Sequence, residues 1–426
     1  MSVRVARLAA LSALAKGPGF LIPIVVAAFF GAAQSTDAYF LAYAGVLVAG
    51  GAFGQPIEAA VVPFAAKALA RGRRAADLLM QSLLYRVIGV GVFAGIVGGL
   101  LLTVGMLSVG SIHVPYGRTV VFYALLMPTV VAWCVAALYS GSLASAWRLE
   151  RAAIAYGFRG MGALIGAVVG AAFHQLWSVA IGMSVGEIAR AWWLRGSWSD
   201  AISQIPDGID HEAPTGFFVA AASQVGAQGV LSVVQFVERL LVGTVAVAAI
   251  SRVEYANRLI MVAAVIFDGG IAPWLLARWS NVGATGGQVS GWRLVYRPIL
   301  FAAALAVLVG AALSVSAPFA VRLLLQHGAF TSEDSSVVAT LLRLYAVGYV
   351  FNMVSLCIER LLLARIQNRL FFVLASVRAS IRILVVIVAL STYQVLALPL
   401  GYLVSEFVYA IMLMAMSSRP RLLSAA

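Results

Sequence analysis

Long apolar runs separated by short polar breaks dominate the pattern of this chain. A helix that crosses the hydrocarbon core of a bilayer needs about 20 predominantly apolar residues, and about twelve segments of that kind can be read from the hydropathy pattern. Their approximate cores are 8–30, 38–64, 80–107, 117–140, 152–172, 175–194, 217–247, 253–275, 297–318, 336–362, 370–390 and 393–416. The pattern therefore predicts an all-α integral membrane protein with about twelve transmembrane helices.

The longest polar break divides these segments into two equal sets. Residues 196–216 read GSWSDAISQIPDGIDHEAPTG, and their Pro, Gly and acidic content is typical of a linker. We expect an N-terminal six-helix lobe over 1–195, a cytoplasmic linker over 196–216 and a C-terminal six-helix lobe over 217–426. Landmarks such as Tyr39 and Tyr255 recur in both halves. The two lobes are therefore expected to be parallel repeats around a central cavity.

Composition agrees with a membrane protein, and the charge reports its orientation. The chain is 62% hydrophobic and 11% charged, whereas a soluble domain carries about 25% charged residues. The formal net charge is +13, but the arginines and lysines gather in alternate loops, on the side that also holds both chain ends. This positive-inside pattern predicts that both termini are cytoplasmic. The basicity thus reflects topology, and no nucleic-acid partner is expected.

No constellation for catalysis or metal binding stands out. The four histidines are dispersed, and Cys134 and Cys357 each lie alone in an apolar run, where a thiol acts as a small packing residue. Nucleotide-binding fingerprints are absent from the sequence. We therefore expect no enzyme activity and no cofactor, and the chemistry left to the chain is binding and translocation.

Polar residues at membrane depth are the first candidates for a binding site. A charge at the centre of a spanning helix costs about 2.5–3.5 kcal/mol, so such a residue normally faces the protein interior. In the first half the charged candidates are Lys16, Asp37, Glu58 and Arg86, and Gln55 is a further polar candidate. Asp37 either caps the second helix or lines a cavity. Glu58 lies deeper and either lines the cavity or forms a salt bridge with Lys16 or with another residue of the lobe.

A polar stripe marks the seventh predicted helix. Gln224, Gln228 and Gln235 fall on one helical face, and Glu238 falls beside it. Such a stripe on an apolar helix faces either a cavity or a partner helix. Glu238 either contacts a substrate or bridges to Arg239 within the bundle.

The eighth predicted helix opens with a second group of polar residues. Asn257 and Arg258 follow Glu254. Glu254 and Arg258 are four residues apart, which suits an intrahelical ion pair, and in that case Arg258 is structural. If Arg258 instead faces the cavity, its guanidinium suits a phosphate or pyrophosphate group.

Several stretches resemble one known family. FGAAQSTDAYFLAYA is similar to the second-helix entry of the MurJ/MviN lipid II flippases, within the multidrug/oligosaccharidyl-lipid/polysaccharide exporter superfamily. VERLLVGTVAVAAISRVEYANRL and LLLQHGAFTSEDSSVVATLLRLYAVGY resemble two further family segments in the same order. The resemblance implies a two-lobed transporter of the bacterial cytoplasmic (inner) membrane, with a role in peptidoglycan or polysaccharide biosynthesis in the cell envelope. It also implies a substrate pyrophosphate held by arginines of helices one, two and eight.

The arginine pattern of the family is only partly present here. Arg258 matches the helix-eight arginine, and Lys16 falls at the first arginine of helix one. The second falls at Ile22. The helix-two pair aligns with Gly50 and Gly51, or beside them with a small gap, and no arginine lies between Asp37 and Pro63. Gln55 takes the place of the acid that follows that pair, and the usual fourteen helices are cut to twelve. These departures favour a diverged member of the family.

Three hypotheses follow. The leading one is a flippase that moves a polyprenyl-pyrophosphate-linked glycan precursor (lipid II-like, or an exopolysaccharide or O-antigen unit) by alternating access, with Lys16 and Arg258 as the main contacts to the anionic head. The second is an exporter of small molecules that is coupled to a cation through Asp37 and Glu58. The third is a scaffold for glycan assembly. Expected partners are the lipid-linked glycan, membrane lipids and, under the second hypothesis, a coupling cation; a monomer is expected.

Overall fold

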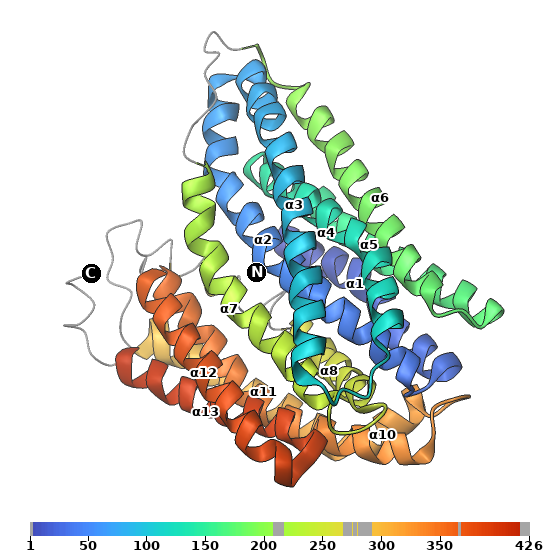
Figure 1. Ribbon diagram of the computed structural model, residues 1–426. Helices are drawn as coiled ribbons and strands as arrows, with labels where there is room; N and C mark the ends of the chain where they lie inside the picture. Colours follow the sequence, from blue (N-terminus) through green and yellow to red (C-terminus); the bar gives the residue numbers. More distant parts are fainter. Residues whose placement is uncertain are drawn as a thin grey trace. The chain divides into compact units, whose positions relative to one another are not determined.

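The computed structural model is built of long α-helices (Figure 1). It describes the backbone of residues 3–207, 217–266, 292–364 and 368–417, together with Leu275 and Trp279. The helices are α1 (Val3–Phe30), α2 (Gln34–Arg71), α3 (Arg73–Val109), α4 (Tyr116–Ser145), α5 (Leu149–Phe173), α6 (Trp177–Ile202), α7 (Phe217–Val242), α8 (Ala249–Ile266), α10 (Arg297–Leu325), α11 (Ser332–Ala364), α12 (Asn368–Tyr393) and α13 (Ala397–Ser417). Two single-turn elements, η2 (Trp292–Tyr296) and η3 (Gln394–Leu396), precede α10 and α13.

Over their described residues the predicted spans fall on these helices, so the all-α membrane fold is confirmed. Residues 267–274 of the eighth predicted span lie outside the described residues. Within the described residues, eight stretches are long and apolar enough to cross a membrane, and they lie in α1 to α5 and α10 to α13. The predicted linker differs in one respect. Its first part, 196–202, continues α6 to Ile202, because Trp198 and Ile202 are buried against the rest of the bundle. Residues 208–216 of the predicted linker lie outside the described residues.

The chain divides into two compact units, Met1–Ala248 and Ala249–Ala426. In the first unit α2 packs along both α4 and α7, as Figure 1 shows, and α5 packs between α1 and α6. The division therefore groups α7 with the helices that precede it. The predicted lobe boundary at 196–216 stays a prediction.

Glycines let α5 and α6 approach each other closely. A Cβ on Gly162 would lie 2.4 Å from the carbonyl oxygen of Gly182, and a Cβ on Gly186 would lie 2.4 Å from that of Phe158. Small residues spaced four apart, as in Gly162–Gly166 and Gly182–Gly186, are the usual way in which membrane helices pack tightly. This crossing brings the polar side chains of the two helices within hydrogen-bonding distance.

Glycines of α2 serve a different purpose, because they make room for an aromatic ring. A Cβ on Gly50 would lie 2.4 Å from the Trp133 ring of α4, and one on Gly54 would lie 2.8 Å from its indole nitrogen. Likewise, a Cβ on Gly141 of α4 would lie 2.2 Å from the carbonyl oxygen of Glu58. The Gly-rich middle of α2 is thus a docking face for α4.

In the second unit α11 packs against α8, α10 and α13. Thr331 and Asp334 close the start of α11 as a capping box, with hydrogen bonds of 3.1 Å from each backbone N–H to the other's side chain. Arg252 of α8 donates to Asp334 at 2.8 Å, and Tyr255 packs edge-on against Phe330 at 5.5 Å. The two segments that resemble the family most specifically therefore contact each other.

Candidate functional site: a buried arginine centre in the first unit

One buried carboxylate pairs with two arginines at the crossing of α5 and α6. Nε of Arg159 donates to one oxygen of Glu187 at 2.6 Å, and Nη1 of Arg190 donates to the other at 2.8 Å. The side chains of Glu187 and Arg190 are 0% and 1% exposed, whereas that of Arg159 is 20% exposed. We call Arg159, Glu187 and Arg190 the arginine centre.

Aromatic rings cover the flat faces of both arginines. The guanidinium of Arg159 lies 4.0 Å from the centre of the Trp133 ring, and that of Arg190 lies 4.0 Å from the centre of the Tyr156 ring. A cation is attracted to the face of an aromatic ring, and more strongly in a desolvated site. The rings therefore stabilise the cations while leaving only the guanidinium edges for hydrogen bonds.

Glu58 of α2 lies beside this centre and is held by hydroxyl groups. The Ser140 hydroxyl donates to it at 2.7 Å, and the Tyr156 hydroxyl lies 3.2 and 3.3 Å from its two oxygens. Within the described residues Glu58 forms no ion pair with Lys16, so the proposed salt bridge between them is not found. Tyr156 links Glu58 to the arginine centre, because its ring also lies under Arg190.

The hydrogen bonds of the arginine centre are incomplete. Nη2 of Arg159 and both Nε and Nη2 of Arg190 are buried and have no hydrogen-bond partner among the described residues. A buried donor left without a partner costs about 1–3 kcal/mol, and more for a charged group. Such a cost in the interior of a membrane protein is typical of functional rather than structural positions.

A second charged cluster lies within the second unit. Arg378 of α12 forms an ion pair with Glu406 of α13 and lies 3.7 Å from Glu359 of α11. Tyr409 donates to Glu359 at 2.9 Å, and Asn352 donates to Glu406 at 3.2 Å. Each carboxylate here has a neutral donor as well as Arg378, so this cluster is better satisfied than the arginine centre.

The predicted residues of α8 adopt the paired arrangement. Nε of Arg258 lies 3.6 Å from Glu254, whose side chain is 2% exposed. The Arg258 side chain is 34% exposed, and Asn257 beside it is half-buried. The intrahelical ion pair is thus present, yet Arg258 keeps an accessible surface.

The other predicted site residues differ in how far they are exposed to solvent. Lys16 and Gln228 are half-buried, Gln55 and Gln235 are exposed, and Asp37 and Glu238 are buried. The side chain of Gln224 lies outside the described residues. Thr36 closes the start of α2 with hydrogen bonds of 2.8 and 2.7 Å to the backbone of Ala33, and Asp37 follows it in the buried first turn.

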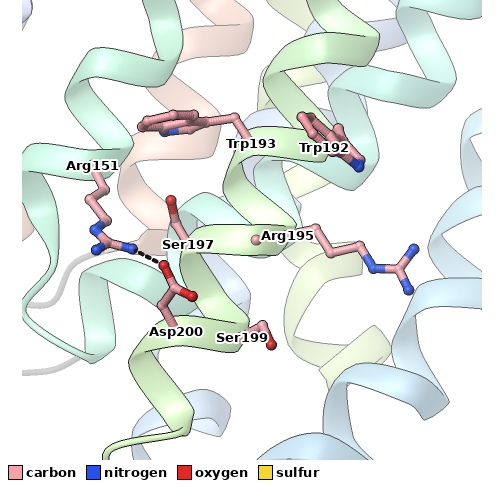
Figure 2. A pocket seen from close by; sticks show the side chains of 8 residues that line it. Arg151, Trp192, Trp193, Arg195, Ser197, Ser199 and Asp200 are labelled. Carbon is pink, nitrogen blue, oxygen red and sulfur yellow. Dashed lines mark hydrogen bonds and ion pairs between the residues drawn. The ribbon is translucent and has the colours of Figure 1, made fainter.

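A surface pocket at the end of α6 has a different character. It has a volume of about 530 Å³ and is lined mainly by Trp192, Trp193, Arg195, Asp200 and Arg151 of α5 (Figure 2). Arg151 and Asp200 point toward each other and bond at 2.8 Å, while Arg195 points away from that pair. Exposed tryptophans beside arginines are typical of a membrane interface. We assign this pocket no binding role.

Sequence reasoning missed Arg159, Glu187 and Arg190. None of the three is among the binding-site candidates that the sequence indicates, although Glu187 and Arg190 lie on one predicted span. Their spacing of three residues on an otherwise apolar helix is the signal that could have found them.

Comparison with known proteins places the chain in a family. A sequence profile described as "Lipid II flippase MurJ" matches residues 26–424. The chain belongs to the MurJ lipid II flippase family. No curated protein sequence matches it significantly.

Solved structures agree on the fold. The lipid II flippase MurJ in an inward closed conformation is similar with a TM-score of 0.78 and 17% identity, over 98% of this chain and 88% of that chain. An inward-facing MATE multidrug resistance transporter of the MOP superfamily matches with a TM-score of 0.75 and 14% identity, over 100% of this chain and 97% of that one. A MOP superfamily transporter from Pyrococcus furiosus matches with 0.68 and 14% identity, over 97% and 95%. The fold is that of all-α membrane transporters.

Proposed function

We propose that this protein flips a polyprenyl-pyrophosphate-linked glycan precursor across the cytoplasmic membrane by alternating access. The observation that carries the proposal is membership of the MurJ family over residues 26–424. An anionic substrate is also consistent with the buried and half-buried arginines of both units, such as Arg190 in the first and Arg378 in the second. The precursor is lipid II or a related exopolysaccharide or O-antigen unit, and the protein acts as a monomer with both termini in the cytoplasm.

Lys16 of the first unit and Arg258 of the second are the proposed contacts to the anionic head. Arg258 supports this role because a third of its side chain remains exposed although it is paired with Glu254. Polar residues proposed to line the substrate path are Asp37, Gln55, Glu58, Gln228, Gln235, Glu238 and Asn257.

Replacing Arg258 tests the function directly. The purified chain is reconstituted in vesicles with a fluorescent lipid-linked glycan, and flipping is measured by the loss of fluorescence to a membrane-impermeant quencher. We expect wild type to flip the lipid and Arg258→Ala to abolish flipping, because a buried pyrophosphate needs a charge-assisted partner.

Arg322→Ala is the matched control, since Arg322 is an exposed arginine of α10. This variant should flip at the wild-type rate. Full activity of Arg258→Ala would remove Arg258 from the site, and a wild-type protein that flips no lipid-linked glycan would remove the proposed function itself.

A cation-coupled exporter of small molecules is the second candidate. It is favoured by Glu58, whose described partners are neutral hydroxyl groups rather than a cation, as suits a carboxylate that exchanges a proton or sodium ion. A proton or sodium gradient should then drive efflux of a small organic cation from vesicles in wild type and not in Glu58→Gln. The absence of any gradient response counts against this candidate.

A further inference from the structure

We propose that Arg159 of α5 is the pyrophosphate contact of the first unit and takes over the task for which the middle of α2, between Asp37 and Pro63, has no arginine. This inference rests on the proposed function and assigns its anionic group to a particular side chain. The residues that carry it are the arginine centre, Trp133 and the two glycines of α2 beneath that ring.

The arginine centre can accept another anion. Its two arginines share the single carboxylate of Glu187, and three of their guanidinium nitrogens are buried without a partner in the part of the chain that the structure describes. Glu58, the other acid nearby, bonds to the hydroxyls of Ser140 and Tyr156 instead. The direct contacts of the pair therefore leave an excess of one positive charge.

The geometry selects a ligand with several acceptor oxygens. An arginine has only donors, and they lie in the plane of its guanidinium. Trp133 covers the flat face of Arg159 at 4.0 Å, and Glu187 accepts from its Nε atom. A ligand must approach in the remaining plane. Nη2 of Arg159 is buried, so a ligand would meet the Nη1 edge first, where phosphate oxygens suit planar donors.

Arg159 is the more accessible of the two arginines to a ligand. The Arg159 side chain is 20% exposed, and that of Arg190 is 1% exposed. Arg159 also lies at membrane depth, roughly 15 Å along α5 from Leu149 at about 1.5 Å per residue. The cation that a ligand can reach is thus held inside the bundle.

The same region is consistent with the lack of an arginine in the middle of α2. Gly50 and Gly54 leave room for the Trp133 ring, and the guanidinium of Arg159 packs on the face of that ring. α1 crosses α5 nearby, since Gly157 faces Ala15 and Gly160 faces Gly19. Lys16 therefore lies in the segment of α1 that packs on the helix of Arg159, and two cations from α1 and α5 suit a group with two phosphates.

Equilibrium binding to the full chain in lipid nanodiscs tests the assignment. The probes are radiolabelled polyprenyl pyrophosphate in the bilayer and inorganic pyrophosphate in the buffer as a competitor. We expect wild type to bind the lipid, inorganic pyrophosphate to displace it, and Arg159→Gln to weaken binding by at least about tenfold through loss of a charge-assisted fork. Arg159→Lys keeps a cation beside Glu187 and should weaken binding by about threefold, because a lysine lacks the planar fork.

Arg118→Gln is the control, because Arg118 is exposed at the start of α4, and it should bind as wild type does. Arg159→Lys carries the test if Arg159→Gln does not fold. Wild-type affinity in either folded variant would overturn the assignment to Arg159 while leaving the flippase function intact. If inorganic pyrophosphate binds in an Arg159-dependent manner but the lipid does not bind, the ligand of Arg159 is not a lipid headgroup, and that part of the proposal is overturned. A wild-type protein that binds neither probe would overturn the proposal together with the proposed function.

Discussion

Glu187 holds two buried arginines with one carboxylate, and each of its oxygens serves a different arginine. Removing its charge would leave two cations in a low-dielectric interior without the carboxylate that bonds to both. Replacing one partner of a buried ion pair typically costs about 3–5 kcal/mol, because the remaining charge stays uncompensated. At the scale of single residues, stability therefore depends on Glu187 more than on any exposed charge.

Glu187→Gln should lower the free energy of unfolding by about 3–5 kcal/mol. Thermal unfolding in detergent, followed by size-exclusion chromatography of the heated protein, measures the loss. Asp200→Asn is the matched control. It breaks the pair of Asp200 with Arg151, whose side chains are 66% and 41% exposed, and an exposed pair contributes at most about 1 kcal/mol. Equal stability of the two variants would contradict the importance of the arginine centre.

Helix α5 is positioned by glycines at the scale of whole elements. Gly162 and Gly186 allow its backbone to approach α6 so closely that Arg159 reaches Glu187. The same contact would be lost if a side chain separated the helices, because membrane helices associate through close van der Waals packing rather than hydrophobic burial. The electrostatics of the centre thus depend on residues that carry no charge.

Gly186→Ala should destabilise the protein by about 1–3 kcal/mol through overpacking, since its Cβ would lie 2.4 Å from the carbonyl oxygen of Phe158. The loss is measured as a lower unfolding temperature. Gly89→Ala on α3 is the control, because a Cβ there meets nothing within 4 Å. It should be neutral or slightly stabilising, since alanine favours the helix by up to about 1 kcal/mol. A larger loss at Gly89 than at Gly186 would show that the crossing is not tightly packed.

The helices could be predicted from the sequence, but most of the candidate site could not. Apolar runs of about 20 residues mark spanning helices by composition alone, so the predicted spans coincide with helices over their described residues. Side-chain partners depend on which helices cross and at what height, which hydropathy does not encode. Glu58 illustrates this: its depth was evident, but its partners Ser140 and Tyr156 lie on α4 and α5. The pair of Glu254 and Arg258 was predictable because it lies within one helix.

Charge placement determines the orientation of the whole molecule in the bilayer. Basic residues gather on one side, and this pattern predicts that the α4–α5 turn is cytoplasmic and the α3–α4 loop is on the opposite side. Both native thiols, Cys134 and Cys357, are buried. The chain is therefore suited to labelling of single introduced cysteines without removing its own.

Ser111→Cys in the α3–α4 loop should react with a membrane-impermeant maleimide in intact cells, because Ser111 is exposed and predicted to lie outside. Trp147→Cys in the α4–α5 turn is the paired variant, since Trp147 is 87% exposed but predicted to lie inside, and it should react only after the cells are permeabilised. Gel mobility of the labelled protein gives the readout. The opposite reactivity would invert the predicted topology.

The Trp133 ring that rests on Gly50 and Gly54 should couple positions 50, 133 and 159 in evolution. No bulky residue fits at position 50 while that ring is present, since a Cβ there would already lie 2.4 Å from it. Relatives with an arginine at position 50 should therefore carry a small residue at position 133 and have no need of an arginine at position 159. In an alignment of the family, these three positions are expected to change together.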